Sequence, residues 1–255
     1  MLDKCKITIN IEVKTNLTQN KLNIGDVFGA AVNDYFSKPS SSLSIKVVTQ
    51  DIGTEKVPVE YLFRKPEKMP ATEQVALSLC TGKVLDVGAC AGAHAVVLQE
   101  KGFEVLALEQ SEKCCEILKA RGIKNVFHGR IEGFNNGKFD TILLLMNGIG
   151  IAGSTEGLVD WLLHLKSLLN ENGQILLTST DVSYLFMEED GSILLDLSGS
   201  YFGELNYKIS YKNEYQEFKW LFLDKDALSY YAEQAQFKIE FISEDEDGTF
   251  LAKLF

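Results

Sequence analysis

The chain has 255 residues, of which 45% are hydrophobic and 24% charged, and its formal net charge is −11. This is the balance of a globular protein with one large α/β domain, or one domain and a small appendage. Nucleic-acid binding draws most of its affinity from neutralised phosphates. An acidic chain without a lysine and arginine cluster therefore argues against RNA, DNA or an anionic membrane surface as partners.

The five cysteines are odd in number and form no Cys-x-x-Cys pair, which predicts neither a disulfide framework nor a metal site. The N-terminal sequence lacks the apolar segment of a signal peptide. No stretch approaches the ~20 apolar residues that a membrane span needs. We therefore expect a cytoplasmic protein with free thiols.

The first part of the chain, residues 1–82, has little apolar content in each predicted element. Polar and apolar residues alternate from Ile7 to Val13, which predicts a half-buried strand whose edge could pair with a second copy in a homodimer. The following expected elements are a helix over 25–36 capped by Asp26, a strand over 43–50, an aromatic and basic segment over 60–70, and a helix that starts near Thr72. We expect this region to be a cap or lid on a domain formed by 83–255.

Strands and helices alternate strictly from Lys83 onward, which indicates βαβ units and a parallel sheet. The expected strands are 83–89, 103–109, 124–129, 139–147 and 173–180; the expected helices are 93–102, 111–122 with Ser111 as cap, and 154–170. A glycine-rich loop, 148–153, precedes the last of these helices.

The tail has a different pattern. Two strands are expected at 205–213 and 215–223 as an inserted antiparallel pair. The aromatic residues of 201–222 are expected in the sheet core, and a substrate cage is the alternative. A helix over 224–236 capped by Asp224 and a terminal hairpin with its turn at 245–248 complete the chain.

The segment VLDVGACAG, residues 84–92, is the most informative motif. Small residues between Gly88 and Gly92 allow backbone N–H groups to approach a ligand at a positive helix terminus. Glu109 ends the next strand, where a carboxylate can accept two hydrogen bonds from a ribose diol. Asp86 distinguishes the possible ligands, because a buried carboxylate repels a pyrophosphate and tolerates a ligand with cationic parts.

The stretch from Asp86 to Gly92 resembles the Asp/Glu-x-Gly-x-Gly-x-Gly motif of class I S-adenosylmethionine-dependent methyltransferases, with Cys90 in place of the middle glycine. The match covers roughly residues 83–255 and is closest to uncharacterised bacterial members with a Tyr-Leu-Phe-Arg segment (61–64) and a Met-Asn-Gly-Ile-Gly stretch (146–150). It implies a doubly wound, Rossmann-like, mostly parallel seven-stranded sheet that ends in an antiparallel hairpin, with a small N-terminal cap.

The resemblance also implies site residues. The cofactor-binding residues it implies are Asp86, Gly88, Ala89, Cys90, Gly92, His94, Glu109, Gln110, Arg130, Ile131, Met146 and Asn147. Among these, His94 is expected at the methionine end unless it only caps its helix. Gln110, Arg130 and Ile131 are expected near the adenine, with Glu132 as a substitute for the family's usual acid. Asn147 is expected to face the transferred methyl group unless it caps a turn.

Four further residues are candidates for a lid or acceptor pocket. Tyr61 and Arg64 are expected either to cover the cofactor carboxylate or to pack as a pair on the domain surface. Asp181 and Tyr184 could line the acceptor pocket or cap the next helix.

The motif and the resemblance together predict transfer of a methyl group from S-adenosylmethionine by direct displacement. The expected acceptor is a small molecule, either cationic or neutral, and a protein is the alternative acceptor. No residue is assigned as a general base, because an acceptor that is already nucleophilic needs none. The alternatives are a non-catalytic S-adenosylmethionine-binding protein and a nicotinamide-dependent oxidoreductase.

Overall fold

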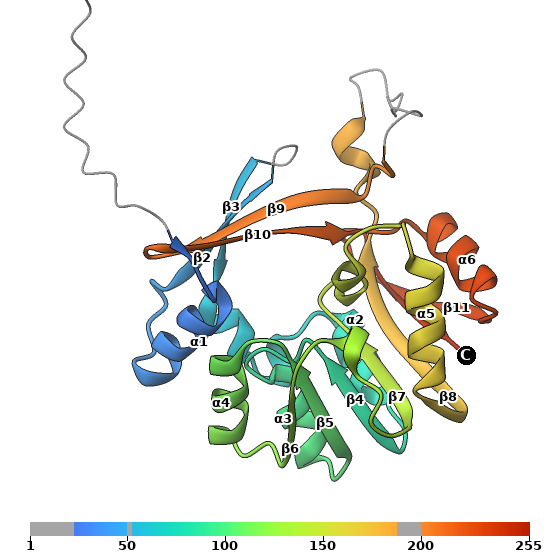
Figure 1. The fold of residues 1–255 in the computed structure, drawn as a ribbon, viewed down its shortest axis with the longest axis horizontal. Coiled ribbons are helices and arrows are strands. Elements are labelled where there is room, and N and C mark those ends of the chain that lie inside the picture. The colour runs from blue at the N-terminus through green and yellow to red at the C-terminus, as the bar shows by residue number, and fades with distance from the viewer. Residues whose placement is uncertain (1–22, 50–52, 188–199) are drawn as a thin grey trace, which may run out of the picture.

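The computed structural model describes residues 23–49, 53–187 and 200–255, which form two β-sheets and their covering helices (Figure 1). The predicted strand from Ile7 to Val13, and the predicted dimer edge with it, lie outside these residues. The four cysteines of the described part are free. In the same part of the chain, no helix is both long and apolar enough to cross a membrane, and no three ligand-type side chains group as a metal site.

The larger sheet has seven strands in the order β11-β12-β8-β7-β4-β5-β6. The strands β8, β7, β4, β5 and β6 are parallel, and β12 and β11 close the sheet as an antiparallel hairpin. The bounds are β4 (Lys83–Val87), β5 (Glu104–Glu109), β6 (Asn125–His128), β7 (Phe139–Leu144), β8 (Leu169–Thr180), β11 (Ile239–Glu244) and β12 (Thr249–Leu254). The expected Rossmann-like sheet with its antiparallel end is confirmed.

Helices cover both faces of this sheet because its strands are apolar on both sides. One face packs against α2 (Ala71–Leu79), α3 (Ala93–Glu100) and α4 (Glu112–Ala120), and the other against α5 (Leu158–Ser167) and α6 (Lys225–Gln234). The predicted caps are present: Ser111 Oγ accepts from Cys114 N, and an Asp224 side-chain oxygen accepts from Ala227 N. Each satisfies a backbone donor that the helix leaves free.

The smaller sheet has the order β1-β10-β9-β2-β3 and lies across the carboxyl ends of the parallel strands (Figure 1). Its elements, with the helix packed against it, are β1 (Asn23–Ile24), α1 (Val27–Ser37), β2 (Ser44–Thr49), β3 (Gly53–Pro58), β9 (Glu204–Tyr211) and β10 (Glu214–Leu221). The antiparallel pair predicted in the tail is β9 and β10, and β9 also pairs with β2. The two halves of the chain thus share one sheet, and a division at residue 82 stays a prediction.

Some elements differ from the expected ones. Strand β3 was not predicted, because its residues are mostly polar and exposed at a sheet edge. Helix α5 is shorter than the expected 154–170, since Gly157 precedes it in a left-handed conformation and β8 already begins at Leu169. The predicted loop over 148–153 contains the 3₁₀ helix η4 (Gly148–Ala152). The other short helices of the described residues are η1 (Val59–Phe63), η2 (Pro66–Lys68), η3 (Ile131–Gly133) and η5 (Ser183–Phe186).

Candidate functional site

A cavity of about 920 Å³ lies between the carboxyl ends of the parallel strands and the smaller sheet. Open α/β sheets bind their ligands at this edge. Ten of the predicted cofactor residues line the cavity: Asp86, Gly88, Ala89, Cys90, His94, Glu109, Gln110, Arg130, Ile131 and Met146. Their convergence follows from β4 and β5 being parallel neighbours whose carboxyl ends open on the same side.

The turn after β4 has an unusual backbone. Gly88, Cys90 and Gly92 have positive φ angles of 72°, 47° and 80°. Glycine adopts this region freely, whereas Cys90 does so against the preference of a residue with a Cβ. The carbonyl of Ala91 accepts a hydrogen bond from Arg121 Nη1 on the far end of α4. The turn is therefore stabilised by a hydrogen bond from the end of α4 as well as by the conformational freedom of its two glycines.

Glu109 connects this turn to the end of β5. Its Oε2 accepts a 2.8 Å hydrogen bond from Cys90 N, and its Oε1 accepts one of the same length from Ser111 N. Burial raises the pKa of Glu109, against the lowering effect of these backbone donors. A carboxylate has about four lone-pair sites, so two accepted bonds leave capacity for a ligand's hydroxyl groups.

Asp86 lies at the end of β4 and is only 3% exposed. Its Oδ2 is buried and has no hydrogen-bond partner among the described residues. Burial raises the pKa of Asp86, whereas the nearby His94 lowers it. A buried carboxylate oxygen without a donor costs free energy unless a ligand supplies one.

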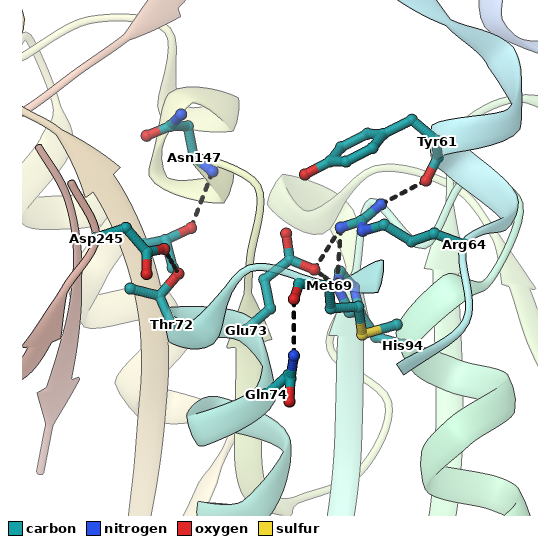
Figure 2. Close-up of polar contacts among 10 residues, drawn as sticks. Tyr61, Arg64, Met69, Thr72, Glu73, Gln74, His94, Asn147 and Asp245 are labelled. Atoms are coloured by element: carbon teal, nitrogen blue, oxygen red, sulfur yellow. Dashed lines mark hydrogen bonds and ion pairs between the residues drawn. The ribbon is translucent and has the colours of Figure 1, made fainter. Parts of the chain in front are cut away.

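A second buried cluster lies beside the turn, and Figure 2 shows Arg64, Glu73 and His94 pointing toward one another from η1–η2, α2 and α3. Glu73 Oε2 forms an ion pair with Arg64 Nη2 and lies 2.8 Å from His94 Nε2. Burial opposes ionisation of Glu73, but the hydrogen bonds and charges of His94 and Arg64 outweigh it, so the pKa of Glu73 is lowered. With Nε2–H donating to Glu73, the His94 ring keeps Nδ1 for other contacts.

The comparisons with known proteins agree with this geometry. A SAM-dependent methyltransferase from Bacteroides fragilis, solved in complex with S-adenosyl-L-homocysteine, is 37% identical to this chain, with a TM-score of 0.84 over 94% of this chain and 96% of that one. The chain belongs to the S-adenosylmethionine-dependent methyltransferases. No protein-family model matches it, and no curated protein does.

More distant structures share the fold of this methyltransferase. One is an S-adenosylmethionine-dependent methyltransferase from Clostridium acetobutylicum, 16% identical with a TM-score of 0.53 over 71% of this chain and 87% of that one. Another is the DhpI–SAH complex, 13% identical with a TM-score of 0.54 over 89% of this chain and 92% of that one.

Two predicted cofactor residues of the methyltransferase lie outside the cavity lining. Gly92 begins α3, and a Cβ on it would meet Leu118 Cδ2 at 2.6 Å. Asn147 donates its backbone N–H to Thr178 Oγ1, and its Oδ1 accepts from Thr180 Oγ1. In the structure, Gly92 packs against Leu118 and Asn147 bonds to the end of β8, both at the edge of the site. Contacts of these two residues with a cofactor stay predictions.

The predicted lid residues of the methyltransferase are also outside the lining. The Arg64 guanidinium lies 4.0 Å from the centre of the Tyr61 ring, so the two residues pack as a pair. Arg64 is only 5% exposed, so its part of this pair is buried and not on the surface. Asp181 Oδ1 accepts from Ser183 N at the start of η5, which is the capping alternative, and Tyr184 is 57% exposed.

Sequence reasoning missed one wall of the methyltransferase cavity. The residues are contributed by the cap and by β10: Asp26, Phe28, Leu62, Gln216, Phe218 and Trp220. Phe218 and Trp220 pack partly in the sheet core, as expected, and they also line the cavity, so the alternative of a substrate cage stays a prediction. Along β10 these rings alternate with charged residues, a pattern that places the rings together on one face of the strand.

Proposed function

We propose that the chain binds S-adenosylmethionine in this cavity and transfers its methyl group to a small-molecule acceptor. The observation that supports this most directly is the pair of buried carboxylates, Asp86 and Glu109, on either side of the turn from Gly88 to Cys90. Glu109 suits a ribose diol, and the buried Asp86 beside the turn would repel a pyrophosphate but suits a ligand with a sulfonium and an ammonium. This disfavours the nicotinamide alternative.

The residues present fit the cofactor part by part. Glu109 would accept from the ribose hydroxyls, and the unpartnered Oδ2 of Asp86 would accept from the cationic methionine end. Gln110 and Ile131, which line the cavity on the β5–β6 side, would flank the adenine. His94 lines the cavity near Asp86 and would border the methionine end, with Arg64 behind it.

The sulfonium of bound S-adenosylmethionine supplies an activated methyl group, which a nucleophilic acceptor atom takes by direct displacement. The protein's part is to hold donor and acceptor in line and to exclude water, and such positioning can contribute about 7–11 kcal/mol at best. Residues of β10 and α1 line the cavity over the strand ends and would shield the reacting atoms from water.

A small molecule is favoured as the acceptor by the shape and charge of the site. A cavity of about 920 Å³ is at the upper end of the range of small-molecule sites, about 300–1,000 Å³, and so has room for a cofactor and a second ligand. The net charge of −11 disfavours a nucleic acid as acceptor.

Calorimetric titration with S-adenosylmethionine, S-adenosylhomocysteine and NAD tests the binding half of this proposal. We expect saturable binding of the first two ligands. In thermal unfolding, either one at about 100 times its dissociation constant should raise the free energy of unfolding by roughly 2.7 kcal/mol. Binding of NAD without either sulfur ligand would contradict the proposal. Release of S-adenosylhomocysteine in the presence of a metabolite panel tests transfer, and binding without any turnover would favour the non-catalytic alternative.

A further inference from the structure

The glycine-rich segment after β7 has a specific partner in β10. A Cβ on Gly150 would overlap the indole of Trp220, which lies directly against the Gly150 backbone. Gly150 has no positive φ, so the absent side chain serves this contact and not the backbone conformation. The glycine therefore permits the indole to sit flat on η4 at the edge of the cavity.

This indole lies on the side of the cavity away from the ribose carboxylate. In the sheet, β5 is on one side of β4 and β7 on the other, so Glu109 and the loop after β7 flank the turn from opposite sides. Ile151, next to Gly150, has its Cδ1 3.1 Å from where a Cβ on Gly88 would be. A nucleoside bound over β5 and β6 would therefore leave the Trp220 end of the cavity free for a second ligand.

Trp220 is one of several rings on this face of the smaller sheet. Phe218 follows two residues earlier on β10 and meets Trp220 edge to face, with ring centres 5.8 Å apart. Tyr207 is the cross-strand partner of Phe218 on β9, and the two rings stack with their centres 5.9 Å apart and 17° between their planes. Because strand side chains alternate, these rings share one face, and Phe28 of α1 also lines the cavity.

The charged residues of the same wall are engaged elsewhere. On β10, Glu217 pairs with Lys208 at 2.6 Å and Lys219 lies 3.8 Å from Glu204, on the alternate positions of the strand. Asp26 accepts from Gly29 N and from Ser111 Oγ.

Gln216 is engaged in the same way, since its Oε1 accepts from Val27 N at 3.0 Å. This wall therefore presents ring faces and edges, while the carboxylates and cations nearest to it already have partners.

We propose that the part of this wall made of Trp220 and Phe218 is the acceptor subsite and that the acceptor carries a planar, uncharged aromatic ring. The inference rests on the proposed methyl transfer and deepens it by naming the substrate class. Aromatic rings prefer offset-stacked and edge-to-face arrangements, which a ring bound in the cavity beside Trp220 and Phe218 satisfies. A cationic acceptor would also be attracted to the ring faces, so a cationic probe is included in the test below.

The test uses full-length protein saturated with S-adenosylhomocysteine and three probes in calorimetry. 2-Naphthol presents an uncharged aromatic ring, decahydro-2-naphthol is its saturated counterpart, and tetramethylammonium is a small cation. We expect 2-naphthol to bind at least about tenfold more tightly than either other probe, a difference of about 1.4 kcal/mol. Absent binding of 2-naphthol, or equal or tighter binding of either other probe, would overturn the proposal.

Variants separate this subsite from the cofactor site. We expect Gly150→Ala, which displaces the indole, and Trp220→Leu each to weaken 2-naphthol binding at least tenfold while the affinity for S-adenosylhomocysteine changes less than about twofold. Trp220→Phe should keep most of the affinity, and Tyr230→Leu, at an exposed ring on α6, should keep all of it. Unchanged 2-naphthol binding in Gly150→Ala and Trp220→Leu would overturn the subsite. If the wild-type protein does not bind S-adenosylhomocysteine at all, that result contradicts the proposed function instead.

Discussion

Glu109 Oε2 accepts a 2.8 Å hydrogen bond from the backbone N–H of Cys90, and this bond joins the end of β5 to the tip of the turn after β4. One carboxylate thereby shapes the turn and faces the cavity that the turn opens into. Cys90 has a positive φ there, and the neighbouring Cys114 thiol and burial both raise the pKa of its own thiol, so the turn carries no thiolate. The relationship leads to the first prediction.

Glu109→Ala should weaken binding of S-adenosylhomocysteine at least about tenfold in calorimetry. Two hydrogen bonds from ribose hydroxyls to a charged acceptor are lost, each about 1.5–3 kcal/mol, and the turn loses its link to Glu109. Glu104→Ala, at the exposed start of the same strand, is the matched control and should bind normally. Wild-type affinity in Glu109→Ala would contradict the ribose role.

Asp86 should give the unliganded protein a distinctive pH dependence. Burial raises its pKa in the folded chain, so above the unfolded value of about 3.9 the folded chain holds a proton that the unfolded chain has lost. Stability from Asp86 is thus present at low pH and lost as the pH rises toward the folded pKa. Chemical unfolding of wild type and Asp86→Asn from about pH 4 to about pH 7 should show wild type losing stability relative to the variant; a constant difference would exclude this account.

Glu73→Gln should destabilise the protein strongly, by about 3–5 kcal/mol, because it leaves the buried Arg64 without its carboxylate. Urea unfolding measures this, and Glu67→Gln at an exposed position should change stability by less than about 0.5 kcal/mol. Replacing both Arg64 and Glu73 by Met removes both charges and should cost less than Glu73→Gln alone. A double variant that is less stable than Glu73→Gln would show that the ion pair itself contributes net stability.

Gly92→Ala and Gly102→Ala separate steric overlap from backbone strain. Both glycines have positive φ, 80° and 91°, but a Cβ on Gly92 meets Leu118 at 2.6 Å, whereas one on Gly102 meets nothing within 4 Å. Each variant should lose about 1 kcal/mol from backbone strain. Gly92→Ala should lose more, and thermal unfolding showing equal losses would mean that Leu118 moves aside freely.

Local patterns were sufficient for most of the larger sheet. Continuous apolar runs such as that of β4 and the caps Ser111 and Asp224 depend on neighbours within a few residues, so their elements can be read along the chain. The same holds for the turn at Gly88 and for Glu109, because parallel neighbours in a βαβ unit bring their carboxyl ends together. These features pointed to the family before any contact was known.

The smaller sheet needed the tertiary structure. β9 pairs with β2 although more than half of the chain separates them, and β3 is a polar edge strand, so no short-range periodicity predicted either arrangement. The role of Glu73 also needed the tertiary structure, because it depends on contacts with Arg64 and His94, which other elements contribute.

The motif from Val84 to Gly92, with Glu109, was thus determined by the sequence alone, since its geometry follows from adjacent strands and a short turn. The wall of Trp220 and Phe218 was decided only by the tertiary structure. Its rings face the cavity because β10 is placed over η4 by pairing and packing between distant segments, and Gly150 leaves the space for the indole. Such contacts depend on how the whole chain packs, which a local pattern does not encode.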